Sequence, residues 1–145
     1  MNEMNNQKAL RLDEMDEQEA RRFLTELLSN LDPEEEYSVR HEDYVMEMPQ
    51  SGERIRGRER MREFQRAYPT PTHGVTIRLR RVLVREGLWV VEGAYDYGGG
   101  EQVLDVMMIC ELRDGKMWRD RWYFAEPFEA PEWRAQWVER MEAGA

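Results

Sequence analysis

The 145-residue chain has the length of one ordinary domain, and its 41% hydrophobic and 35% charged residues favour a folded protein with a charged surface over a disordered one. A net charge of −9 disfavours binding to nucleic acid or to anionic membranes, because both carry negative charge. Cys110 is the only cysteine, which excludes an intramolecular disulfide and a cysteine-based zinc site, and neither histidine, His41 or His73, has a partner at metal-ligand spacing.

The opening segment, MNEMNNQKALRLDEMDEQEA, has no apolar core of signal-peptide type, and no stretch approaches the length of a transmembrane helix. We therefore expect a cytoplasmic protein without a membrane partner. We divide the chain into an N-terminal extension, residues 1–15, and a single domain, residues 16–142.

Three helices are predicted in the first half of the chain. Apolar residues recur at helical spacing over residues 20–31, which predicts a helix from about Asp16 to Asn30. In DPEEEYSVRH, Asp32 fits an N-cap and Pro33 the first helical position, which favours a short second helix. DYVMEM reads as a strand, PQSGERIRG as a turn, and RERMREFQRAY as a third helix that PTPTHG ends.

The second half has a strand period. Four long strands are predicted, over residues 75–85, 88–97, 101–112 and 116–125, joined as an antiparallel meander. The apolar parity in VTIRLRRVLV switches across Arg80 and Arg81, so we expect a bulge that bends the sheet there. Pro131 opens a last predicted helix, whose apolar face contains Trp133, Trp137, Val138 and Met141. Helices followed by a curved sheet indicate an α+β fold.

The connection LRDGK decides which residues of the last strand face the interior. A two-residue turn at Asp114 and Gly115 would set Asp120 opposite Ile109, whereas a three-residue loop with a left-handed Gly115 would set it opposite Met108. We favour the three-residue loop, because it brings the aromatic face of the strand onto the unbroken apolar row Leu104, Val106, Met108, Cys110 and Leu112. The inner face then carries Trp118, Asp120, Trp122 and Phe124. The outer row contains Met107 and Ile109 and is half apolar, so we expect it to be covered by a second subunit's sheet in a homodimer.

Two segments resemble the polyketide-cyclase-like (SnoaL-like) members of the nuclear transport factor 2-like superfamily. DYVMEMPQSGERIRGRERMREF is similar to their pattern of a strand ending in Pro, a Gly turn, and Gly-Arg opening a helix, and ELRDGKMWRDRWYFAEP is similar to their closing hairpin. With the element order, the resemblance covers roughly residues 16–140. It implies a cone-shaped, curved antiparallel sheet that wraps around the N-terminal helices and encloses a pocket. Relatives include ketosteroid isomerases, polyketide cyclases, limonene-type epoxide hydrolases, scytalone dehydratases and members that only bind or associate, so the resemblance specifies the fold better than the activity.

The resemblance to the epoxide hydrolases is partial at the level of single residues. Trp122 stands where they place a catalytic Asp, and Gly93 and Tyr95 stand where they place an Arg and an Asp, so their water-activating constellation is absent. Their pocket asparagine corresponds to Glu47 and their pocket tryptophan to Asp120. The resemblance therefore implies two carboxylates that face each other across the cavity.

Each candidate residue has a functional and a structural interpretation. Asp120, between Trp118 and Trp122, would lose solvation, which raises the pKa of a carboxyl group toward neutrality, where it exchanges protons with a substrate. Alternatively, it pairs with Arg80, Arg119 or Arg121. Glu47 is the second acid or base, or else the ion-pair partner of an arginine in GERIRGR. Tyr95 donates a hydrogen bond to a substrate oxygen, or else fills the core with its hydroxyl at the rim.

Two classes of function remain open at this point. In the first, the protein is a cofactor-independent isomerase, cyclase or lyase acting on a small, apolar, oxygenated molecule, with Asp120 and Glu47 as the acid/base pair and Tyr95 as the oxyanion donor. The predicted pocket lining is Trp89, Val91, Leu104, Val106, Met108, Trp118, Trp122 and Phe124, with no metal site and no cofactor. In the second, the protein is a non-catalytic ligand-binding or purely structural homodimer of the same fold.

Overall fold

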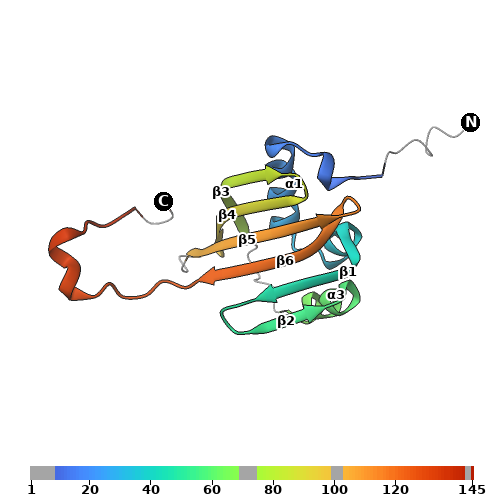
Figure 1. The fold of residues 1–145 in the computed structure, drawn as a ribbon. Helices are drawn as coiled ribbons and strands as arrows, with labels where there is room; N and C mark the ends of the chain where they lie inside the picture. Colours follow the sequence, from blue (N-terminus) through green and yellow to red (C-terminus); the bar gives the residue numbers. More distant parts are fainter. Residues whose placement is uncertain (1–8, 69–74, 99–102, 143–144) are drawn as a thin grey trace, which may run out of the picture.

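A curved, unclosed sheet covers one side of a set of helices in the computed structural model, which describes residues 9–68, 75–98, 103–142 and 145 (Figure 1). The sheet has six strands in the order β2-β1-β6-β5-β4-β3. The elements are η2 (Leu12–Glu14), α1 (Glu17–Asn30), α2 (Pro33–Val39), β1 (Arg40–Met48), β2 (Glu53–Arg56), α3 (Arg58–Ala67), β3 (Thr76–Arg85), β4 (Leu88–Asp96), β5 (Val103–Arg113), β6 (Lys116–Ala125) and η3 (Glu132–Trp137). The predicted α+β fold is confirmed.

The first two helices begin at the residues that the sequence predicts. The Asp16 side chain accepts a hydrogen bond from the Glu19 backbone N–H at 2.8 Å, and the Glu19 side chain accepts one from the Asp16 N–H, which completes a capping box. Asp32 accepts from the Glu34 N–H at 3.0 Å, and Pro33 follows it as the first residue of α2. Both helix starts are therefore fixed by local sequence.

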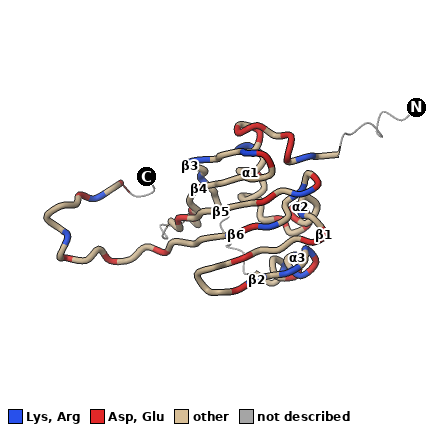
Figure 2. The backbone as a smooth tube through the Cα atoms, in the orientation of Figure 1, with Lys and Arg blue, Asp and Glu red and all other residues tan. Residues whose placement is uncertain are grey.

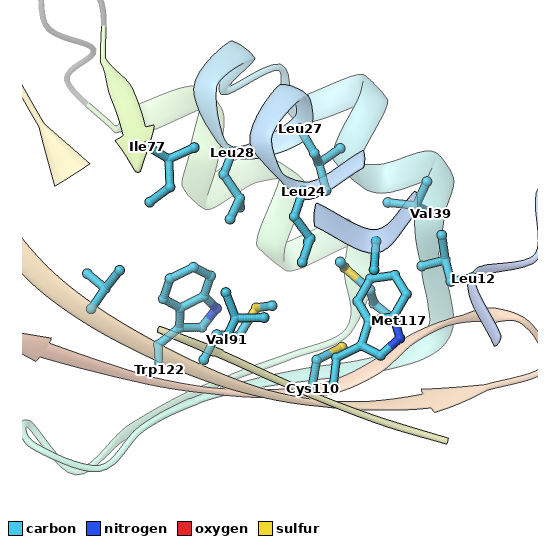
Figure 3. Close-up of a cluster of buried hydrophobic side chains, with 14 of the residues drawn as sticks. Leu12, Leu24, Leu27, Leu28, Val39, Ile77, Val91, Cys110, Met117 and Trp122 are labelled. Atoms are coloured by element: carbon cyan, nitrogen blue, oxygen red, sulfur yellow. The ribbon is translucent and has the colours of Figure 1, made fainter. Parts of the chain in front are cut away.

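The core lies between α1 and the inner face of the sheet. Figure 3 shows Leu24 and Leu28 of α1 on one side of the cluster and Val91 and Trp122 of the sheet on the other. The cluster extends to Leu12, which is 1% exposed and whose N–H donates to the Gly115 carbonyl oxygen at 2.9 Å. Residues 12–14, assigned to the N-terminal extension from sequence, thus pack against the β5–β6 hairpin.

The strands from β3 to β6 form the predicted antiparallel meander. The register between β3 and β4 shifts between Leu79 and Arg81, which confirms the bulge expected at Arg80 and Arg81. Gly93 lies beside this bulge, where a Cβ atom would meet the Arg78 carbonyl oxygen at 2.5 Å. The close approach of the two backbones therefore requires glycine at this position.

The last hairpin differs from the predicted loop. Asp114 and Gly115 both have positive φ and form a two-residue turn, with Arg113 paired to Lys116. The register then shifts at a bulge on β6, so that Asp120 lies opposite Cys110 rather than opposite Met108. The prediction of a three-residue loop is wrong, but Asp120 and Trp122 still face the interior.

The bulge also changes the environment of Trp118. The register pairs Met117 with Leu112 and Arg119 with Glu111, which leaves Trp118 without an opposite residue. Trp118 lies under the guanidinium groups of Arg113 and Arg119, at 5.1 and 4.7 Å from its ring centroid, and Met117 is buried in the core. The prediction that Trp118 lines the pocket is therefore wrong.

Two further segments differ from their predictions. PQSGERIRG contains a turn and also the short strand β2, which pairs antiparallel with β1. The predicted C-terminal helix is the six-residue 3-10 helix η3, of which no residue is buried. Residues 126–142, which we call the C-terminal arm, continue from the end of β6 and run away from the sheet as far as η3, after which the chain turns back (Figure 1). His73 lies outside the described residues.

Charged residues are spread along the backbone. Figure 2 shows Lys and Arg residues interspersed with Asp and Glu residues on the helices and on the arm. No helix in the described part of the chain is long and apolar enough to cross a membrane.

Candidate active site

A cavity of about 120 Å³ lies between the helices and the inner face of the sheet. Most of its lining is apolar, and the polar residues come from α2, β1, α3, β4 and β6. The lining residues are Leu27, Leu28, Leu31, Glu36, Arg40, Met46, Met61, Gln65, Tyr95, Met108, Met117, Asp120, Trp122 and Phe124. A few polar groups in a mostly apolar cavity are typical of small-molecule sites.

Asp120 is the buried acid that the sequence predicts. Its side chain accepts a hydrogen bond from the Tyr44 hydroxyl at 2.6 Å on Oδ2, whereas Oδ1 is buried and has no hydrogen-bond partner among the described residues. Burial raises the pKa of Asp120, and this effect exceeds the opposing effects of the Cys110 thiol, the Tyr44 hydroxyl and the charge of Arg40. The site therefore favours the neutral carboxylic acid more than water does.

Tyr44 holds this acid in place. It is fully buried, and burial followed by the negative charge of Asp120 raises the pKa of its phenol well above the ordinary value. The phenol thus keeps its proton and donates a hydrogen bond to Asp120 Oδ2. Met46, two residues along β1, lies opposite Asp120 in the parallel β1–β6 register, so the strand pairing sets Tyr44 on the same face as the acid.

Glu36 is a second buried carboxyl group in the same cavity. Its Oε2 accepts from Gln65 Nε2 at 2.5 Å, and its Oε1 lies 3.4 Å from Arg40 Nη2. Burial raises the pKa of Glu36 to about 7, against the lowering effects of Arg40 and Gln65 and with a smaller raising effect from Asp120. The two acids are therefore electrostatically coupled.

Arg40 is the single cation among the described lining residues. Its Nη1 donates to Gln65 Oε1 at 2.7 Å, and its guanidinium lies 4.8 Å from the centroid of the Tyr44 ring. Its Nε is buried and has no hydrogen-bond partner in the part of the chain that the structure describes. The site is electrically neutral when Arg40 is charged and Glu36 and Asp120 share one proton, so that one of the two acids is ionised. A low-dielectric site favours this neutral state.

Tyr95 lines the cavity from β4, as expected for a hydrogen-bond donor. Burial, followed by the nearby charge of Glu36, raises the pKa of its phenol, which therefore stays protonated. The hydroxyl is available as a donor at any physiological pH.

Glu47 does not reach the cavity. In the β1–β6 register it lies opposite Arg121, on the opposite face of β1 from Met46 and Tyr44. Its carboxylate pairs with Arg54 at 2.5 Å and with Arg121 at 3.5 Å, and the hydrogen bond from Arg54 is the main cause of its lowered pKa. The two carboxylates expected to face each other are thus on opposite faces of the sheet, and Glu47 has the ion-pair environment that was its alternative interpretation.

The ion-pair alternative for Asp120 is not what the structure contains. Arg80 pairs with Asp105, Arg119 with Glu111 and Arg121 with Glu47. No ion pair within the described ranges joins Asp120 to any of these arginines.

The predicted lining residues divide into two groups. Met108, Trp122 and Phe124 line the cavity, and the rings of Trp122 and Phe124 stack with centroids 5.7 Å apart. The others on the sheet belong to or pack against the hydrophobic core instead, and they are Trp89, Val91, Leu104 and Val106.

Sequence reasoning missed the polar residues Glu36, Arg40, Tyr44 and Gln65. The parity of β1 was an available signal for Tyr44, since Tyr44, Met46 and Met48 alternate with Val45 and Glu47. Glu36 and Arg40 are four residues apart, and that spacing alone also fits an exposed ion pair.

The described residues contain no group of three or more His, Cys, Asp and Glu side chains that could hold a metal ion. The polar groups of the cavity are instead two carboxyl groups, an arginine, a glutamine and a tyrosine, a set suited to proton transfer and hydrogen bonding.

Comparisons with known proteins agree with the resemblance predicted from sequence. The family model of the SnoaL-like domain matches residues 20–120. No curated protein matches the chain significantly.

Solved structures show the same fold. An NTF-2 like protein of unknown function from Burkholderia xenovorans LB400 is 32% identical with a TM-score of 0.67, over 86% of this chain and 94% of that chain. A putative ketosteroid isomerase from Kribbella flavida DSM 17836 is 28% identical with a TM-score of 0.72, over 85% of this chain and 87% of the other. An LEH-like epoxide hydrolase of M. tuberculosis is similar in fold alone, at 23% identity and a TM-score of 0.57, over 70% and 77% of the two chains.

Proposed function

The chain belongs to the SnoaL-like domain family, and from this premise we propose that its cavity binds a small, largely apolar, oxygen-containing molecule and exchanges protons with it without a cofactor. This is the chemistry of a cofactor-independent isomerase, cyclase or lyase. The observation that carries the proposal is Asp120, a buried carboxyl group that lines the cavity with one oxygen held by Tyr44 and the other without a partner among the described residues.

Asp120 is the proton donor in this proposal. Burial favours its neutral form, and the Tyr44 hydroxyl occupies Oδ2. In this proposal a ligand contacts Oδ1, which is buried beside Cys110 and Trp122, once those side chains give way. A carboxylic acid kept neutral in apolar surroundings donates a hydrogen bond or a proton to a substrate oxygen. Tyr95, which lines the same cavity from β4, is a further hydrogen-bond donor to the ligand.

Glu36, instead of Glu47, is the base. A pKa of about 7 is suited to general-base catalysis near neutral pH, because the group is then present in both protonation states. The Glu36 carboxylate accepts a proton from a substrate carbon while Asp120 gives its proton to the substrate oxygen, which forms an enol. Glu36 then returns its proton to the same carbon (exchange) or to another carbon (isomerisation) while the enol proton returns to Asp120, so the starting protonation state is restored. No electrons are gained or lost in this cycle, and Arg40 stabilises the negative charge that moves between the two acids.

The size of the cavity limits the ligand. At roughly 30 Å³ per water molecule, 120 Å³ corresponds to about four waters, which is below the ~300 Å³ of typical drug-sized sites. A ligand larger than a small ring or short chain would have to extend into an adjoining open hollow of about 430 Å³, which shares Trp122 and Phe124 with the cavity.

A non-catalytic binding protein is the second candidate function. The small volume of the cavity favours it, as does the packing of Trp89, Val91 and Val106 into a continuous core. In this alternative Asp120 and Tyr44 form a buried hydrogen-bonded pair that orients a ligand without exchanging protons with it.

Hydrogen–deuterium exchange at carbon tests the catalytic proposal. Small cyclic ketones and enones are incubated with the protein in D₂O, and loss of the proton next to the carbonyl group is followed by NMR. We expect catalysed exchange that Asp120→Asn abolishes and that Glu47→Gln, a matched change on the outer face, retains. Ligand-detected binding without exchange above the buffer rate would support the non-catalytic alternative instead.

A further inference from the structure

The C-terminal arm carries large apolar side chains that are exposed and not covered by the described part of its own chain. Phe128 is 79% exposed, Trp133 73% and Trp137 70%, and Val138 and Met141 are also exposed. Single exposed apolar residues are ordinary on a protein surface, but five large ones within fourteen residues, interspersed with charged residues, are a concentration of the kind that marks an interaction site. The arm lies beyond the residues that the family model matches, so the SnoaL-like fold does not account for it.

The arm is built to extend away from its own domain. Pro127 and Pro131 fix their own φ angles, and each disfavours the helical region for the residue before it, so this stretch favours an extended course. At roughly 3.3 Å per residue, the stretch from Ala125 to Trp133 spans up to about 26 Å beyond the end of β6. Figure 1 shows the arm running away from the sheet along the direction of β6. A sharp reversal between the two prolines would be needed to bring Trp133 and Trp137 back to the same chain.

The open hollow beside the cavity is a surface that fits an aromatic side chain. It has a volume of about 430 Å³ and is lined by Met48, Gln50, Ser51, Trp122, Phe124 and Glu126. The stacked rings of Trp122 and Phe124 form its wall, with an angle of 8° between their planes. Aromatic rings attract one another through their quadrupoles, in addition to the effect of the apolar area that they bury.

We propose that the arm of each chain docks in the open hollow of a second copy of the same chain, so that the two copies exchange arms and each arm closes the mouth of its partner's cavity. The arm begins at Glu126, which itself lines the hollow, and an extended arm carries Trp133 up to about 23 Å away from that origin. A twofold axis makes the exchange reciprocal: the arm that begins beside the hollow of one copy docks in the hollow of the other copy, and the second arm does the same in return. Docking also excludes water from the cavity that holds Asp120, although the exchange of arms does not depend on any catalysis there.

Disulfide trapping tests the docking site. Ser51→Cys introduces a thiol in the hollow, and Gln136→Cys introduces one between the two arm tryptophans; Cys110 is fully buried and does not compete. The two single variants are mixed in equal amounts and oxidised. We expect a disulfide-linked species with the mass of two chains, and none when Gln18→Cys, an exposed position on α1, replaces Ser51→Cys.

The same pair within one chain distinguishes exchange from self-closure. In the double variant Ser51→Cys/Gln136→Cys at low concentration, an intramolecular disulfide with the mass of one chain would show that the arm covers its own cavity and would overturn the proposal. Absence of the mixed disulfide under oxidising conditions that link the variants nonspecifically at high concentration would overturn it as well.

Light scattering and sedimentation give an independent readout on the otherwise unmodified chain. We expect a dimer at micromolar concentration, whose dissociation constant rises at least tenfold in Trp133→Ala/Trp137→Ala. The control Leu10→Ala/Phe64→Ala removes exposed apolar side chains outside the arm and should leave the constant unchanged. A mass of one chain for the wild type, or an equal constant for wild type and arm variant, would refute arm exchange.

Discussion

Glu36→Gln is expected to remove a pH dependence of stability that originates in the cavity. Burial raises the pKa of Glu36 from 4.5 to about 7, so the folded state binds this proton more tightly than the unfolded state does. Between these two pH values unfolding releases the proton, and the free energy of unfolding of the wild type falls as the pH rises. The stabilising contribution of Glu36 is fully present below pH 4.5 and is lost as the pH rises through about 7.

The magnitude follows from the two pKa values. The difference between 7 and 4.5, at roughly 1.36 kcal/mol per pKa unit, corresponds to about 3 kcal/mol. Glutamine is neutral at every pH and keeps an oxygen that accepts from Gln65 or Arg40, so it resembles the protonated acid. The free energy of unfolding of Glu36→Gln relative to wild type should therefore increase by about 3 kcal/mol between pH 4.5 and pH 7 and then level off.

Urea denaturation followed by tryptophan fluorescence at a series of pH values measures this difference. Groups that titrate identically in both proteins cancel, so the difference reports Glu36 together with its coupling to Asp120. Glu63→Gln makes the same chemical change at an exposed position of α3, and its difference from wild type should not vary with pH. A flat or falling difference for Glu36→Gln would refute the reasoning, because it would mean that Arg40 keeps Glu36 ionised in the folded protein.

Four further substitutions test other parts of the structure. Asp120→Asn should leave the free energy of unfolding at pH 7 unchanged or increased, since burial disfavours the ionised carboxylate; a strong loss in urea denaturation would identify a structural ion pair instead. Tyr44→Phe deprives Asp120 Oδ2 of its donor and should cost about 1–3 kcal/mol in the same assay, whereas wild-type stability would contradict the assigned bond. We propose that the outer sheet face also packs against the second copy, so Met107→Glu should raise the dissociation constant in sedimentation; an unchanged constant would exclude that face. Gly93→Ala should destabilise the fold by about 1–3 kcal/mol, because its Cβ would meet the Arg78 carbonyl oxygen, and an unaffected urea midpoint would show that the bulge yields without cost.

The elements that the sequence predicts correctly are those set by nearby residues. The capping box of Asp16 and the Asp32-Pro33 start of α2 are complete within four residues, so local sequence suffices for both. The bulge beside Arg80 and Arg81 leaves its signature in a single strand, because the apolar positions change parity there.

The register of the last hairpin depends on its turn and on a bulge in β6, and the sequence indicated only the turn. Asp114-Gly115 is a typical pair for a two-residue turn with positive φ. The sequence nevertheless favoured a longer loop, because a two-residue turn alone would direct the aromatic face of the strand away from the interior. The bulge at Trp118 resolves the conflict, because one extra residue in β6 returns Asp120 to the inner face. The face was predicted correctly with the wrong loop, since either device inserts one residue and so restores the same parity.

The second acid of the cavity could not be found from local patterns. Glu36 lies in the acidic first half of a short helix, where carboxylates are favourable on the surface because of the helix dipole. Its burial depends on α3, which supplies Gln65, and on Arg40 at the start of β1. Only the packing of the two short helices together brings these groups into one cavity.

The position of Asp120 in the cavity is enforced partly by residues that never contact the cavity. β1 and β6 are distant in sequence and pair in parallel, with Met46 opposite Asp120 and Glu47 opposite Arg121. A slip of either strand by one residue would turn its whole inner row outward and carry Glu47 or Arg121 into the apolar interior. Burying either charge without its partner costs far more than the surface pairing contributes, so the outer-face pair disfavours the slipped register. The Tyr44–Asp120 hydrogen bond joins residues that are 76 positions apart in the sequence. It forms because the apolar residues of the inner face favour this strand register, while the charged residues of the outer face would be unstable in the interior.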